Sequence, residues 1–220
     1  MSEAKQEILS RIRTSTTKLA MSRAAEYAAI PRAYQQRGTL EAKQRVALLV
    51  DRLHDYGCEV YDCADSDLTY TMRRILRERG KLRMLATGDL PFRWLPSEID
   101  FFEDSALTHE DVDSTDGVVT RCALAIASTG TLVLRHAGEE GRRALSLIPD
   151  YHLCIVFDHQ IVETVPEALR KMSSFGSAPI TTISGPSATS DIEMTRIRGV
   201  HGPRTLDVIL VKSDLESTRG

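Results

Sequence analysis

The stretch best suited to bind an anion covers residues 184–211 and reads SGPSATSDIEMTRIRGVHGPRTLDVILV. It opens with small hydroxyl residues, and its glycine lets the backbone approach a ligand. We expect Ser187 to cap a short helix over residues 187–194, whose free amides would attract a phosphate or carboxylate. The alternative is that Ser187 only caps and the other hydroxyls face water. Because the loop follows a strand directly, we favour binding, through Ser184, Gly185, Ser187, Ala188 and Thr189.

The turn His201-Gly202-Pro203-Arg204 lies in the same stretch. Arg204 is suited to clamp a carboxylate through two hydrogen bonds, and His201 to accept a proton near neutral pH. A single histidine beside a Gly-Pro turn is more often a structural hydrogen-bonding group. The functional interpretation makes Gly202 and Arg204 ligand contacts and His201 the candidate base. Two acids near these loops are candidate catalytic carboxylates, Asp191 and Glu193.

A third candidate is the turn Ser128-Thr129-Gly130-Thr131. Its glycine is typical of a tight hairpin in which positive φ is needed, and this interpretation is the stronger one. In the alternative, Thr129, Gly130 and Thr131 would orient a carboxylate or thioester. The Gly-Arg-Arg at 141–143 is a further possible anion contact, although paired arginines usually lie on a solvated face.

The elements that must position these turns alternate between helix and strand. Apolar spacing predicts a helix from residue 39 to Gly57, a strand at 58–63, a helix at 66–80 and a strand at 82–86. Further strands are expected at 151–157, 179–184 and 205–211, a hairpin within 117–136 and a helix capped by Thr164 and Glu167. This order predicts an α/β/α sandwich with a mostly parallel sheet plus an antiparallel hairpin.

The ends of the chain and residues 90–102 are less regular. Residues 4–13 predict a short amphipathic helix, residues 14–38 an arm, and residues 213–220 a polar tail, which leaves 39–212 as a single domain. Residues 90–102 carry the only tryptophan between two prolines, which indicates a loop packed on the core more than a functional lid.

Composition excludes several classes of function. The chain has 220 residues and a net charge of −3, with basic residues spread along its length, so we expect no nucleic-acid partner. No apolar run is long enough to cross a bilayer and the N-terminus is no signal peptide, which predicts a cytoplasmic protein. The four cysteines lack metal-ligand spacing, so they are expected to be buried thiols, with no zinc or iron–sulfur cluster.

Four segments closely resemble the LUD-domain family, specifically its lactate-utilisation protein C (LutC/YkgG) group. They read GVVTRCALAIASTGTLVL, RRALSLIPDYHLCIV, QIVETVPEAL and the stretch 184–211, so the resemblance runs almost continuously from Gly117 to Val211. The segment IPRAY at 30–34 is also similar to that family's N-terminal arm. Many relatives carry an acidic residue where this chain has Ser128, which places any catalysis at that turn in doubt.

The resemblance implies a fold similar to the sugar-phosphate isomerase and coenzyme A transferase group, and a role in oxidising L-lactate to pyruvate. It also implies partner subunits that carry iron–sulfur clusters, with this chain as the cluster-free member. The turns described above lead us to expect that this member binds a small anionic ligand. Two alternatives stay open. One is a stand-alone enzyme of the coenzyme A transferase or sugar-phosphate isomerase type, and the other is a small-molecule sensor.

Overall fold

The computed structural model describes residues 3–104, 107–137, 141–190, 196–198 and 202–213. Residues 1–35 and 36–220 form two compact units. The first contains helix α1 (Glu3–Ala29), so the prediction of a helix that ends at residue 13 is wrong. The stretch after residue 13 contains good helix formers and no proline or glycine until Pro31, which disfavours a helical residue before it. No helix within the described residues is long and apolar enough to cross a membrane.

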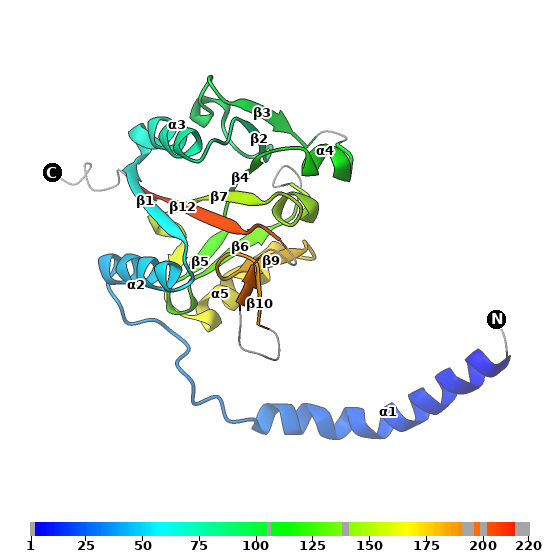
Figure 1. Cartoon of the computed structure of the whole chain (residues 1–220). Helices are drawn as coiled ribbons and strands as arrows, with labels where there is room; N and C mark the ends of the chain where they lie inside the picture. Colours follow the sequence, from blue (N-terminus) through cyan, green and yellow to red (C-terminus); the bar gives the residue numbers. More distant parts are fainter. Residues whose placement is uncertain (1–2, 105–106, 138–140, 191–195, 199–201, 214–220) are drawn as a thin grey trace. The chain divides into compact units, whose positions relative to one another are not determined.

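The second unit is built on a six-stranded sheet in which every neighbouring pair is parallel (Figure 1). Its order is β1-β12-β7-β4-β2-β3. The strands are β1 (Glu59–Ala64), β2 (Arg83–Ala86), β3 (Asp100–Glu103), β4 (Gly117–Arg121), β7 (Tyr151–Phe157) and β12 (Thr205–Lys212). Strands β7 and β12 are central and almost wholly buried, as their continuous apolar runs predict. The predicted α/β fold class is therefore confirmed.

A second sheet holds the predicted antiparallel hairpin, which does not extend the parallel sheet. Its order is β8-β5-β6-β9, where β5 and β6 form the hairpin and β9 is antiparallel to β6. The strands are β5 (Leu124–Ile126), β6 (Thr131–Arg135), β8 (Ile161–Val162) and β9 (Ile180–Ile183). A further pair is β10 (Ala188–Ser190) with β11 (Arg196–Arg198). Because β10 begins at Ala188, the predicted helix over 187–194 is wrong at its start, and residues 191–194 lie outside the described residues.

Helices cover the two faces of the parallel sheet. On one face, α3 (Leu68–Glu78) packs with the segment around Trp94 against alternate residues of β7 and β12. On the other face, α2 (Ala42–Asp55) and the second sheet pack against the intervening residues, and α4 (His109–Asp113) covers β2 and β4. Helix α5 (Val165–Met172) covers the outer face of the second sheet. Thr164 accepts from the amide of Glu167 in the predicted capping box, whereas Asp67 precedes α3 without a side-chain cap.

The expectation of a loop at residues 90–102 is largely met. Trp94 sits in a 3₁₀ turn, Phe92–Trp94, and packs into the core with 8% of its surface exposed. The last residues differ from the expectation, because they pair with β2 as the edge strand β3. All four cysteines are buried free thiols, as predicted.

One buried ion pair anchors α3 to the centre of the parallel sheet. Asp207 on β12 is fully buried and receives two hydrogen bonds from the Arg79 guanidinium, at 2.9 and 3.0 Å. The Tyr151 hydroxyl donates a third, at 2.9 Å. Burial and the nearby Asp207 carboxylate raise the pKa of Tyr151 well above its ordinary value, so the phenol stays protonated as a donor.

Candidate functional site

The predicted anion-binding loop lines a cavity at the amino ends of β7 and β12. This amino-edge cavity has a volume of about 310 Å³ and lies between the parallel sheet and β9. Its polar walls come from the loop 184–187, from β9 and from the turn before β7, and include Ser184, Ser187, Thr181, Ser146, Arg143 and His152. Ligand sites in parallel sheets usually lie at the carboxyl ends of strands, the rule that selected these turns. This cavity lies at the opposite edge, because residues 201–204 precede β12.

The structure connects parts of all three predicted turns by hydrogen bonds, although Thr129, Gly130 and Thr131 do not line this cavity. The hydroxyls of Thr129 and Thr131 are hydrogen-bonded at 2.7 Å, and the Thr131 hydroxyl is 2.8 Å from that of Ser184. The Ser187 amide donates to the Pro203 carbonyl at 2.8 Å. Turns that are far apart in the sequence are thus joined by direct hydrogen bonds.

Two of the three predicted turn glycines serve packing within the fold. Gly130 ends a 3₁₀ turn with φ of 59°, and an added Cβ would lie 2.8 Å from Cβ of Arg52 on α2. Gly185 has φ of 86°, and its Cβ would lie 2.6 Å from Cβ of Tyr56. The close backbone approach that the sequence assigned to a ligand is therefore made to Tyr56.

The remaining predicted residues are less well placed, or lie where the structure gives no side-chain position. Arg204 is exposed and donates to Asp150 at 2.6 Å, so its charge is already paired. Gly202 lies beside Ser187, since its Cβ would be 3.5 Å from that of Ser187. Outside the described residues are Asp191, Glu193 and His201, and the side chains of Ala188 and Thr189 are not described either. Ser187 begins no helix, so the argument from free helix amides does not hold there.

His152 is the histidine that the sequence reasoning missed. It lines the amino-edge cavity with 1% of its surface exposed, and its Nε2 is 2.8 Å from the Thr120 hydroxyl. Its Nδ1 has no hydrogen-bond partner among the described residues. Burial lowers the pKa of His152 to about 4, so the ring is neutral at pH 7. The signal in the sequence was a histidine within the largely apolar run YHLCIVF.

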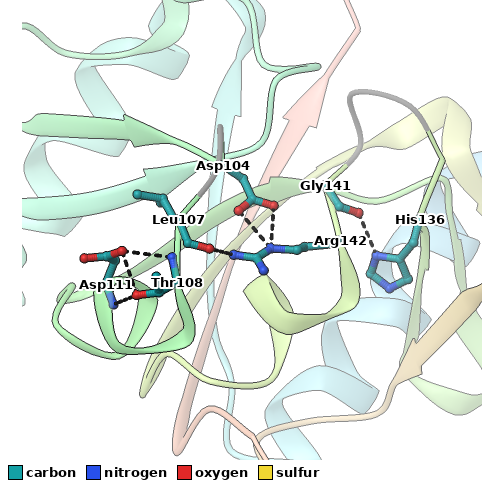
Figure 2. A network of polar contacts seen from close by, with 7 residues as sticks. All are labelled: Asp104, Leu107, Thr108, Asp111, His136, Gly141 and Arg142. Atoms are coloured by element: carbon teal, nitrogen blue, oxygen red, sulfur yellow. Dashed lines mark hydrogen bonds and ion pairs between the residues drawn. The ribbon is translucent and has the colours of Figure 1, made fainter.

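The two arginines of the Gly-Arg-Arg segment behave differently. Arg142 is held by the Asp104 carboxylate and the Leu107 carbonyl, and its guanidinium points away from His136 (Figure 2). Arg143 is exposed at the rim of the amino-edge cavity and makes no ion pair with the described residues. Arg143 is therefore the cation that this cavity offers to an anion.

The described part of the chain contains no group of three His, Cys, Asp or Glu side chains that could hold a metal ion. The expectations that the chain binds no metal and carries no cofactor of its own stay predictions.

The fold defines a known class of α/β protein. The crystal structure of a DUF162 family protein from Deinococcus radiodurans is similar, with a TM-score of 0.69 and 36% sequence identity over 79% of this chain and 99% of that one. A model of the LUD domain matches residues 46–211, so the chain belongs to the LUD-domain family. The resemblance found in the sequence is confirmed.

Several curated relatives have similar sequences. The Lactate utilization protein C of Deinococcus radiodurans is 42% identical over 164 residues, which are 73% of this chain and 76% of the relative. That of an Exiguobacterium species is 27% identical over 183 residues, 78% of each chain. The uncharacterized protein YkgG of Escherichia coli is 39% identical over 84 residues, 36% of each chain.

Proposed function

We propose that this protein acts in lactate utilisation, as the cluster-free subunit of a complex that oxidises L-lactate to pyruvate. The observation that carries this proposal is the 42% identity to a Lactate utilization protein C over about three quarters of both chains. Conversion of L-lactate to pyruvate releases two electrons and two protons. In the proposed complex, iron–sulfur clusters of partner subunits take the electrons, and this chain contributes binding and orientation.

The amino-edge cavity is our proposed site for a small anionic ligand of this subunit. Arg143 would neutralise the anion at the rim, and the hydroxyls of Ser184 and Ser187 would donate to it. His152, neutral at pH 7, would donate or accept one hydrogen bond through Nδ1 at the deep end. The earlier assignment of Arg204 to charge neutralisation gives way to Arg143, because Arg204 already has Asp150 as its partner.

A gene deletion tests the role in lactate utilisation. The deletion strain is expected to grow normally on pyruvate and to lose growth on L-lactate, and the intact gene is expected to restore it. Pyruvate is the matched control, since it is the product of the proposed oxidation. Normal growth of the deletion strain on L-lactate would contradict the proposal.

Purification from lactate-grown cells tests the complex separately. The tagged chain is expected to bring down iron-containing partner proteins and lactate-dependent dye reduction. An arginine-to-glutamine variant at Arg143 is expected to retain the partners while lowering dye reduction. Recovery of an iron-free protein alone would refute the complex and favour a stand-alone enzyme or sensor.

A further inference from the structure

A second cavity lies at the opposite edge of the parallel sheet, and of the anion contacts predicted from the sequence Arg142 alone lines it. This carboxyl-edge cavity has a volume of about 260 Å³ and lies beyond the ends of β2 and β4. Its polar walls include Thr87, Asp89, Thr120, Arg121, His136 and Gln160. The position agrees with the general rule that ligands of parallel sheets bind at the carboxyl ends of strands.

Most polar groups around this cavity are already used by the fold. His136 Nδ1 is 3.0 Å from the Gly141 carbonyl, which can only accept, and its Nε2 is 2.8 Å from the Thr181 hydroxyl (Figure 2 shows the first contact). Gln160 donates to the Cys122 carbonyl and accepts from the Phe157 amide. These side chains shape the wall and have little capacity left for a ligand.

Arg142 also lines this cavity, but its charge is offset. Its Nε lies 2.9 and 3.0 Å from the two oxygens of Asp104, and its terminal nitrogen donates to the Leu107 carbonyl. Figure 2 shows the guanidinium between these two partners. Arg142 therefore anchors the turn before β7.

Arg121 differs from Arg142. It is the last residue of β4 and lies half-buried, and its Nε is buried with no hydrogen-bond partner among the described residues. Its guanidinium carbon lies 5.7 Å from the centre of the Trp94 ring and 5.8 Å from that of Phe157. Aromatic faces stabilise a cation only partly, and a buried N–H group normally has a hydrogen-bond acceptor as well.

Asp89 supplies a second feature of the site. It is a carboxylate lining the same cavity, and it accepts from the Thr87 hydroxyl at 2.6 Å through Oδ1 only. Asp89 and Arg121 do not form an ion pair within the described residues. The cavity thus combines an unpaired cation with a carboxylate that can still accept a hydrogen bond.

We propose that the carboxyl-edge cavity binds a small monocarboxylate that carries a hydroxyl group, with its carboxylate on Arg121 and its hydroxyl donating to Asp89. A carboxylate matches the planar fork of the Arg121 guanidinium. A phosphate dianion fits less well, because the Asp89 carboxylate would repel it. This cavity shares Ser146 with the amino-edge cavity, but Arg121 and Asp89 line only this one. The choice of L-lactate as the ligand to test rests on the proposed function.

Trp94 provides a direct measurement, since it is the only tryptophan in the chain and lies against Arg121. Purified full-length protein is titrated with L-lactate, with propionate, which lacks the hydroxyl, and with inorganic phosphate, while tryptophan emission is recorded. L-lactate is expected to give a saturable change at concentrations at least tenfold lower than propionate or phosphate. No saturable change with L-lactate, or tighter binding of phosphate, would overturn the proposal.

Two variants place the ligand. Arg121→Gln is expected to weaken L-lactate binding at least tenfold, while Arg77→Gln, which removes an exposed arginine of α3, is expected to leave it within twofold. Equal loss in Arg77→Gln, or unchanged binding in a folded Arg121→Gln, would refute the assignment. If Arg121→Gln does not fold, Asp89→Ala decides, because it removes the acceptor of the ligand hydroxyl and must therefore remove the preference for L-lactate over propionate.

Discussion

Buried His152 makes the stability of the protein depend on pH in a way that one substitution can isolate. Its pKa is lowered by burial from 6.5 to about 4, so between these values the unfolded chain binds more protons than the folded protein. The stability that this group contributes is complete above pH 6.5 and is lost as the pH falls toward 4. Proton linkage with these two values gives a loss of roughly 2 kcal/mol between pH 7 and pH 5.

The test compares the native protein with His152→Leu in urea unfolding at pH 7, 6 and 5, followed by Trp94 fluorescence. The substitution removes the hydrogen bond to Thr120 and lowers stability at every pH, but this offset does not change with pH. Between pH 7 and pH 5, the free energy of unfolding of the variant should therefore fall by about 2 kcal/mol less than that of the native protein. His54→Gln, which changes an exposed histidine, should retain the native slope. Parallel curves for the native protein and His152→Leu would refute the reasoning.

Two further substitutions test the packing of the fold by urea unfolding. Asp207→Asn should lower the free energy of unfolding by roughly 2–3 kcal/mol. This loss is smaller than for a fully buried ion pair, because Arg79 keeps 36% of its side-chain surface exposed. A loss below about 1 kcal/mol would contradict a structural role for the pair. Gly185→Ala should lower the free energy of unfolding by roughly 2–4 kcal/mol, because the new Cβ combines a positive φ with a clash against Tyr56. Gly80 also has a positive φ but lies in open space, so Gly80→Ala should lower it by about 1 kcal/mol. Equal costs at the two glycines would contradict the close contact with Tyr56.

Local patterns in the sequence predicted the regular elements well. The strands at 151–157 and 205–211 were visible as apolar runs because both faces of a central parallel strand are buried. The helix after Thr164 was predicted from its capping box, which depends on residues three apart. Such features are fixed by neighbours in the chain, so a single sequence reveals them.

Features that depend on distant contacts were not predictable in this way. A run of hydroxyl residues before acidic residues is compatible with a helix cap as well as with a strand. Residues 188–190 form a strand because they pair with residues 196–198. The glycine at 185 is explained by Tyr56, 129 residues earlier, which no local pattern indicates. The state of each arginine likewise depends on whether the fold brings a carboxylate to it, as it does for Arg204 but not for Arg121.

The two cavities share Ser146 and are otherwise divided by hydrogen-bonded pairs of side chains, in which each member lines one cavity. Thr120 lines one cavity and is hydrogen-bonded to His152, which lines the other, and His136 is joined in the same way to Thr181. These contacts occupy polar atoms that a ligand would otherwise use. The groups left available are a buried neutral imidazole and a rim arginine on the amino side, and Arg121 with a carboxylate on the other side. Among the described residues, an acid lines the carboxyl-edge cavity alone, and this difference is what our proposal of a hydroxyl-bearing ligand for that cavity uses.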